Sequence, residues 1–275
     1  MQYGHAAWGL RELPLEEQFK LAKAMDVQLL ELSIANGDND FLQLNSGKKE
    51  FARVGELCTR YGVRPDCGCT GNDFTVESAI ELGESLDKVK RAVDIAAEVG
   101  VKVLRIFAGF ASDSVVYGER FDRMLDALQS AAAHAKGTSV QLSIETHGGV
   151  IALGDAIHHV HSISTRCDTL KTMLDALPAE TVGLNFDPAN LAAVGQLAPE
   201  RFFTVFHNRI NLVHLKDFKD VKGGIVPVGC GEGRLDWNAL MKELRDYDGP
   251  ALIEYELPGD VEDGLRRSLD FLKKF

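Results

Sequence analysis

The chain of 275 residues lacks the features expected of a membrane protein or a nucleic-acid-binding protein. No apolar run approaches the roughly 20 residues that a membrane-spanning helix needs. Lysine and arginine number 30 against 41 aspartates and glutamates, which gives a formal net charge of -11. Because phosphate backbones are bound by an excess of positive charge, we expect no nucleic-acid partner. We expect no membrane partner either.

Cysteine is scarce and irregularly spaced. No second pair completes a zinc site with the Cys67-x-Cys69 pair, and the total of five is odd. The first residues, MQYGHAAWGLRE, have neither the basic region nor the apolar region of a secretory signal. These features predict reduced thiols and a cytoplasmic location.

Short apolar runs alternate with longer amphipathic segments eight times, and no linker interrupts them. Hydrophobic residues make up 45% of the chain and charged residues 26%, which is typical of a folded globular protein. The alternation predicts βα units on a parallel sheet, in one domain spanning residues 1–275. The predicted strands are residues 3–10, 27–34, 63–70, 101–109, 140–147, 182–188, 210–217 and 251–256.

Helical spacing of apolar residues is clear between several of these strands, at residues 15–25, 85–100 and 120–137. The last two segments end at Gly100 and Gly137, where left-handed helix caps are expected. Eight units can close into a barrel or spread into a doubly wound sheet. No Gly-x-Gly-x-x-Gly turn follows the first strand, and polar residues cluster at strand ends. We therefore predict an α/β fold, the (β/α)₈ TIM barrel.

Ionisable residues stand at the ends of four consecutive predicted strands: Glu145, Asp187, His214 and Glu254. In such barrels the C-terminal strand ends meet at one mouth. Each residue alone fits a salt bridge, a helix cap or a core histidine. Together, three converging carboxylates would repel one another unless a cation lay between them. We predict one divalent metal ion, Mn²⁺ first, with Mg²⁺, Co²⁺, Zn²⁺ or Fe²⁺ also compatible.

This ligand set resembles that of the sugar phosphate isomerase/epimerase superfamily, the xylose isomerase-like TIM barrels of AP endonuclease family 2. The late segment VGCGEGRLDWNALMKELRDYDGPALIEYE resembles the family's glycine-rich turn, Asp-Trp helix and final strand. The resemblance covers nearly the whole chain and implies that Glu145, Asp187, His214 and Glu254 are the metal ligands. It also implies that Glu145 and Glu254 serve as catalytic acid and base on opposite faces of the substrate.

Further residues are candidates for the mouth of the barrel. His147 lies two residues beyond Glu145 and is a candidate catalytic residue, with simple loop polarity as the alternative. Lys216 lies two residues beyond His214 and is a candidate substrate contact, with pairing to Asp217 as the alternative. The other candidate substrate contacts are Asn190, Glu31 and Arg105. His5, in the first predicted strand, is a further candidate. The histidines at 158, 159 and 161 indicate a solvated loop.

Three positions depart from patterns in relatives. Asn190 stands where relatives often carry a histidine three residues after the aspartate ligand, which argues against a trinuclear zinc site. Ketose 3-epimerases carry a substrate-binding glutamate six residues after the first ligand and an arginine six after the histidine. Here these positions hold Ile151 and Asp220, which argues against that subgroup.

The function expected is a metal-dependent isomerase or epimerase of carbohydrate metabolism. It would act on a sugar, keto-sugar or inositol derivative by metal-stabilised enediolate proton transfer. The alternative is a lyase of the same fold, such as an inosose or dehydroshikimate dehydratase or a 3-keto-glycoside lyase. A sugar-binding barrel without catalysis is a third possibility that four intact ligands disfavour. The expected partner is a small carbohydrate, and a homo-oligomer is compatible with the sequence.

Overall fold

Eight parallel strands close into a barrel, in the order β1-β12-β9-β8-β5-β4-β3-β2. The computed structural model describes residues 1–153 and 156–275. The predicted (β/α)₈ barrel is confirmed, and each predicted strand contains or overlaps one barrel strand. The barrel strands are β1 (Gln2–His5), β2 (Leu29–Ser33), β3 (Arg64–Cys69), β4 (Val103–Ile106), β5 (Gln141–Glu145), β8 (Val182–Phe186), β9 (Ile210–Leu215) and β12 (Pro250–Ile253).

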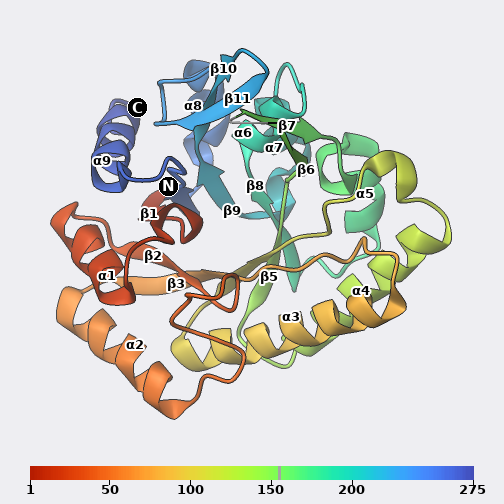
Figure 1. Cartoon of the computed structure of the whole chain (residues 1–275), viewed down its shortest axis with the longest axis horizontal. Coiled ribbons are helices and arrows are strands. Elements are labelled where there is room, and N and C mark those ends of the chain that lie inside the picture. Colours follow the sequence, from red (N-terminus) through yellow and green to blue (C-terminus); the bar gives the residue numbers. More distant parts are fainter. Residues whose placement is uncertain (154–155) are drawn as a thin grey trace.

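Helices surround the barrel, as Figure 1 shows, and bury their apolar faces against it. They are α1 (Leu15–Ala24), α2 (Lys48–Tyr61), α3 (Ala79–Val99), α4 (Glu119–Ala135), α5 (Cys167–Asp175), α6 (Pro188–Ala193), α7 (Glu200–Phe206), α8 (Trp237–Glu243) and α9 (Val261–Leu272). Short 3₁₀ turns lie at Trp8–Leu10, Asp113–Val115, Ile163–Thr165, His207–Arg209 and Leu244–Asp246. None of the helices in the described ranges has the length and hydropathy needed to cross a membrane.

The helix boundaries partly follow the glycine pattern. Gly100 ends α3 in the left-handed conformation, with φ of 85°, as predicted. The matching prediction for Gly137 is wrong, because α4 ends at Ala135 with Lys136 as a right-handed cap. Gly137 instead donates its N–H to the carbonyl of His134 in a tight turn.

A second sheet of four strands, which we call the inserted sheet, lies beside the barrel strands at the upper edge of Figure 1. Its order is β10-β11-β7-β6, and its strands pair antiparallel. They are β6 (Gly149–Leu153), β7 (Ala156–Val160), β10 (Asp217–Val221) and β11 (Gly224–Val228). Two hairpins form it, one after β5 and one after β9. These two barrel strands carry the predicted ligands Glu145 and His214.

The inserted sheet corrects one prediction. His158 and His159 lie in strand β7 rather than in a solvated loop. The sheet has its own small hydrophobic cluster, formed by Ala189, Phe218 and Ile225 and separate from the main core. A histidine pair between glycine-rich and serine-rich stretches carries no strong strand signal, although in the fold both histidines pair with the nearby strand β6.

Candidate metal centre

The four predicted ligands converge at one point at the C-terminal end of the barrel. One donor atom from each of Glu145, Asp187, His214 and Glu254 lies within 4.8 Å of all the others, and all four residues are buried. Glu145 is the last residue of β5, and His214 lies within β9. Asp187 and Glu254 each directly follow a strand, β8 and β12. Four neighbouring strands therefore bring together residues more than 100 positions apart.

Asp187 and Glu145 are fixed by the backbone and by one amide. Asp187 caps helix α6, and its Oδ1 accepts the backbone N–H of Asn190 at 2.8 Å. The side-chain amide of Asn190 donates to Glu145 Oε1 and to Asp187 Oδ2, both at 3.0 Å. Asn190 thus bridges two ligands, while its Oδ1 has no hydrogen-bond partner among the described residues. Its predicted contact with substrate stays a prediction.

His214 presents one ring nitrogen to the other ligands and the second to Glu31. Its Nδ1 lies 3.8 Å from Glu145 Oε1 and 3.7 Å from Glu254 Oε1, and its Nε2 lies 3.6 Å from Glu31 Oε1. Glu31 is itself held by the backbone N–H of Ala7, which donates to Oε2 at 2.9 Å. A carboxylate behind a histidine is a common arrangement at metal sites, where it orients the ring.

Two buried cations neutralise the outer oxygens of the glutamates. Arg105 Nε lies 3.3 Å from Glu145 Oε2, and Lys216 Nζ lies 2.7 Å from Glu254 Oε2. Lys216 also lies 3.2 Å from Asp187 Oδ2. Each glutamate therefore turns Oε1 toward His214 and Oε2 toward a cation.

Glu256 is part of the same network, and the sequence analysis missed it. Its Oε1 lies 3.1 Å from Lys216 Nζ. The spacing that identified Lys216, two residues beyond a ligand, applies equally to Glu256 after Glu254. Asp217, the alternative partner for Lys216, instead accepts hydrogen bonds from Gly233 N and Trp237 Nε1.

The charges at the centre shift the pKa values of its residues in opposite directions. Burial raises the pKa of Glu145, and Arg105 only partly opposes this. Burial acts the same way on Glu254, but Lys216 and His214 outweigh it and lower the pKa to about 2. For His214, burial favours the neutral ring, yet Glu254 and Glu31 raise its pKa to about 9. This concentration of negative charge, with both His214 nitrogens lacking a hydrogen-bond partner in the described ranges, fits a bound cation.

His147 lies beside the centre but beyond the strand, since β5 ends at Glu145. Its backbone N–H donates to Ser164 Oγ at 3.0 Å. Its Nδ1 lies 2.6 Å from the carbonyl oxygen of Gly148. Because a carbonyl only accepts, the proton sits on Nδ1 and Nε2 keeps its lone pair. Burial lowers the pKa of His147 to about 3, so the ring is neutral.

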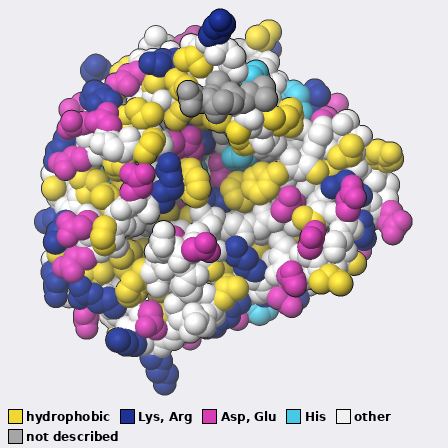
Figure 2. Space-filling model, in the orientation of Figure 1, with side chains coloured by type: hydrophobic (Ala, Val, Ile, Leu, Met, Phe, Trp, Pro, Cys, Tyr) yellow, Lys and Arg dark blue, Asp and Glu magenta, His cyan; other side chains and the backbone are white. Residues whose placement is uncertain are grey.

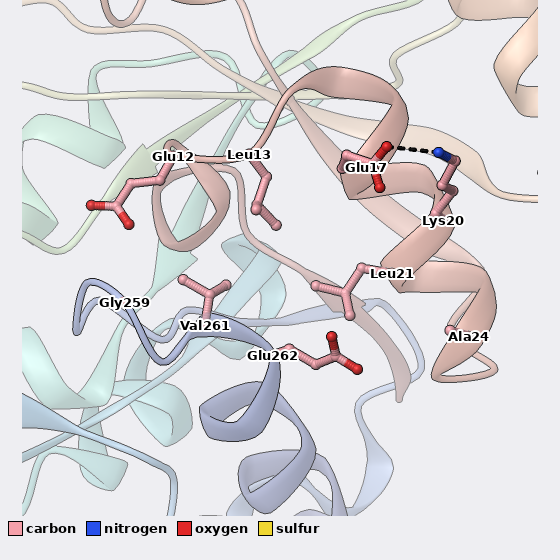
Figure 3. A pocket seen from close by; sticks show the side chains of 9 residues that line it. All are labelled: Glu12, Leu13, Glu17, Lys20, Leu21, Ala24, Gly259, Val261 and Glu262. Atoms are coloured by element: carbon pink, nitrogen blue, oxygen red, sulfur yellow. Dashed lines mark hydrogen bonds and ion pairs between the residues drawn. The ribbon is translucent and has the colours of Figure 1, made fainter.

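His5 is also buried, on β1, with both ring nitrogens lacking partners among the described residues. Figure 2 shows this face of the molecule hollowed near its middle, with acidic and histidine side chains visible inside and hydrophobic ones around them. A second hollow of about 420 Å³, drawn in Figure 3, lies between α1 and the start of α9. It contains Glu12, Glu17 and Glu262 but none of the four ligands.

Comparison with known proteins agrees with this architecture. Residues 19–275 match the model of the xylose isomerase-like TIM barrel family. L-ribulose-5-phosphate 3-epimerase UlaE of Salmonella typhi is 23% identical in an alignment of 250 positions that covers 86% of this chain and 81% of that protein.

Two solved structures share the fold. The probable 3-DHS dehydratase AsbF of Bacillus anthracis matches with a TM-score of 0.80 and 14% identity over 99% of each chain. The 3-keto-D-glucoside 4-epimerase YcjR of E. coli matches with a TM-score of 0.74 and 17% identity over 100% of each chain. With the family model matching most of its length, this chain belongs to the xylose isomerase-like TIM barrel family.

Proposed function

We propose that this chain is a divalent-metal-dependent isomerase or epimerase of a small carbohydrate that carries a carbonyl group. The observation that supports this most is the set of four buried donor atoms within 4.8 Å of one another, surrounded by titratable groups. The similarity to UlaE, an epimerase of a keto-sugar phosphate, supports the same reaction class.

Glu145, Asp187, His214 and Glu254 would hold the ion, with Mn²⁺ as our first choice for three oxygen donors and one imidazole. When bound, the ion polarises a carbonyl and its neighbouring hydroxyl and so makes the adjacent C–H more acidic. Glu31 holds the ring of His214 in place from behind. Glu31 therefore orients the candidate ligand His214. We propose this role in place of the substrate contact predicted from the sequence.

The protein's own residues move the proton. Glu254, whose outer oxygen Lys216 holds at 2.7 Å, is the carboxylate that accepts a proton from carbon. Glu145, whose outer oxygen faces Arg105, is the group that returns a proton on the other side of the substrate. Lys216, Arg105 and Asn190 line the same centre and bind the substrate's oxygens.

The second candidate function is that of a lyase, and the free lone pair of His147 favours it. This neutral imidazole keeps a free lone pair on Nε2 and is not one of the four ligands. Such a group presents its lone pair to carbon without sharing it with a metal, although burial, which lowers its pKa to about 3, makes it a weak base. The similarity in fold to the dehydratase AsbF supports the lyase as the second candidate function. Both reactions begin with a proton removed beside a carbonyl, and they differ in whether a leaving group then departs.

Metal analysis and solvent exchange test the proposal. We expect one bound divalent ion per chain, and incorporation of deuterium from solvent at carbon when keto-sugars and inososes are screened with Mn²⁺. An unsaturated product that absorbs in the ultraviolet would instead identify elimination. The double variant Glu145→Gln with Glu254→Gln should lose metal binding and lower turnover by about a thousandfold or more.

The matched control is Glu12→Gln with Glu262→Gln, which changes the charge equally in the separate hollow of Figure 3. This control should keep both metal and turnover. The proposal fails if the wild-type protein binds no divalent ion, or if the Glu145 and Glu254 double variant behaves like the control.

A further inference from the structure

The inserted sheet turns one face toward the barrel and the other toward solvent. Side chains alternate along β7, so Ile157 and His159 share a face and His158 points the opposite way. Ile157 packs against the cluster of Ala189, Phe218 and Ile225. His158 is exposed, and its Nε2 bonds the carbonyl of Gly223. His159 therefore lies on the inner face of the sheet.

His159 stands between two rings that belong to the mouth of the barrel. Its ring centroid lies 5.8 Å from that of His147 and 5.8 Å from that of Phe218. Both of its ring nitrogens are shielded from solvent and have no hydrogen-bond partner within residues 1–153 and 156–275. Leaving a buried polar group unpaired is unfavourable, because the group loses its hydrogen bonds to water. A bound molecule with a hydroxyl would remove that cost.

Phenylalanine rings continue the surface on the other side of His147. Phe107 and Phe110 have centroids 4.7 Å apart and lie 5.3 Å and 5.4 Å from His147. We call the four rings of Phe107, Phe110, His147 and His159 the aromatic wall, and the buried Phe218 packs against His159 from the small hydrophobic cluster. Arg105 joins this wall to the metal centre, because its guanidinium lies 4.3 Å over Phe107 and its Nε lies 3.3 Å from Glu145.

The wall carries little charge of its own. The nearby cations already have acidic partners: Arg105 with Glu145, Lys216 with Glu254, and Arg234 with Asp220 at 2.7 Å. Burial lowers the pKa of His159 to about 3, with His147 and Lys216 acting in the same direction, so its ring is neutral. A neutral imidazole donates to and accepts from a hydroxyl, whereas a phosphate is best bound by unpaired cations.

We propose that His159 determines substrate specificity by binding a hydroxyl of an uncharged cyclic keto-polyol, whose C–H face lies on the aromatic wall. The flat face of a six-membered ring covers several aromatic side chains at once, while an open chain covers fewer. The carbonyl on the far side of that ring then reaches the metal centre. This inference rests on the proposed function and narrows its substrate from carbohydrates in general to uncharged rings.

Calorimetric binding to the Mn²⁺-loaded full chain tests it, with scyllo-inosose as the cyclic probe and L-ribulose 5-phosphate as the open-chain phosphorylated probe. We expect the cyclic ketone to bind about tenfold more tightly or better. His159→Phe keeps the ring and removes the nitrogens, so it should weaken binding of scyllo-inosose about tenfold, the loss expected for one hydrogen bond. His158→Phe, on the opposite face of the same strand, is the matched control and should bind like the wild type.

A second variant, His159→Asn, restores a donor and an acceptor and should recover part of the affinity. Tighter binding of the phosphate, no binding of the cyclic ketone, or equal losses in His159→Phe and His158→Phe would each overturn the inference. Titration of Mn²⁺ into the same samples separates the two proposals. Normal Mn²⁺ binding with the wrong probe preference removes only the specificity inference, while absent Mn²⁺ binding removes the proposed function as well.

Discussion

The barrel and the inserted sheet meet at the metal centre but are built on different principles. The barrel strands are buried on both faces, and their ends carry the four candidate metal ligands. The inserted sheet has a small cluster of its own, and its outer face is exposed at Ile151 and Val221. Rigid, regular strands hold the reactive groups, while two hairpins added to β5 and β9 carry His159 and Phe218.

This difference separates two kinds of residue at the centre. The ligands require positions fixed to a fraction of an ångström, which a closed parallel barrel provides. Residues that select the substrate tolerate a less rigid support, and added loops vary more readily than barrel strands do. Ile151 and Asp220, where ketose 3-epimerases carry substrate-binding residues, both lie in the inserted sheet. The chain thus departs from that subgroup in the part that we assign to specificity.

The largest effect on stability should come from deleting the same side chain in each region. Phe19 on α1 is fully buried in the main core, and Phe218 is buried under the inserted sheet. Phe19→Ala should lower the free energy of unfolding by about 3–5 kcal/mol, as expected for a cavity of that size. Phe218→Ala should lower it less, because the inserted sheet can open without unfolding the barrel.

Denaturant unfolding and amide hydrogen exchange measure both effects. In Phe218→Ala, faster exchange should be confined to β6, β7, β10 and β11. In Phe19→Ala it should extend to the barrel strands. Uniformly faster exchange in Phe218→Ala would mean that the two sheets unfold as one cooperative unit.

The sequence predicts the barrel well for a physical reason. Strands that are buried on both faces appear in the sequence as continuous apolar runs. An ionisable residue at the end of such a run needs a charged or hydrogen-bonding partner. That logic identifies Glu145, Asp187, His214 and Glu254 without knowledge of their distances. It fails for the inserted sheet, because its short and partly exposed strands form no continuous apolar runs, and its two antiparallel strand pairs are joined only through Ile157 and Ile225. His159 pairs within a sheet completed by β11, more than 60 residues later.

The sequence also does not predict which residues contact one another at the centre. The sequence makes Glu31 and Arg105 candidate substrate contacts, yet nothing in their spacing indicates which residue each would contact. Glu31 lies behind His214, and Arg105 lies beside Glu145. The first contact depends on the closure of the barrel, which leaves only β1 and β12 between β2 and β9, and the second joins the neighbouring strands β4 and β5. Sequence spacing therefore locates the centre, and the fold assigns contacts within it.

The next prediction concerns the effect of Glu31 on Mn²⁺ affinity. Glu31 faces the candidate ligand His214 but is not one of the four candidate ligands. Glu31→Gln keeps the shape of the side chain but removes the charge that faces His214 Nε2. We expect Mn²⁺ affinity to fall by about 10–100-fold, the usual loss when a supporting carboxylate is removed. The four-ligand set stays intact, so the metal should still bind at high concentration.

Isothermal titration with Mn²⁺ measures this loss. Glu256→Gln is the informative comparison, because Glu256 contacts Lys216 and not His214. It should change Mn²⁺ affinity less than Glu31→Gln does. An unchanged affinity in Glu31→Gln would show that His214 needs no support from β2.

The last prediction concerns the pH dependence of stability, and it probes His159 in the inserted sheet. The pKa of His159 in the folded chain is about 3, lowered mainly by burial, against about 6.5 in an unfolded chain. Because the folded state keeps the ring neutral, its contribution to stability is complete above pH 6.5 and is lost as pH falls toward 3. Each pH unit in that window removes about 1.4 kcal/mol at most.

His159→Phe has no proton to take up, so its stability should fall less steeply below pH 6.5 than that of the wild type. Unfolding by urea at a series of pH values, with a chelator present so that metal binding does not contribute, measures the difference between the two curves. Buried His5, whose pKa burial lowers to about 4, destabilises both proteins equally at low pH and cancels in that difference. Parallel curves would mean that water reaches the ring of His159 in solution, and they would remove the unpaired buried nitrogens from which its role in specificity was argued.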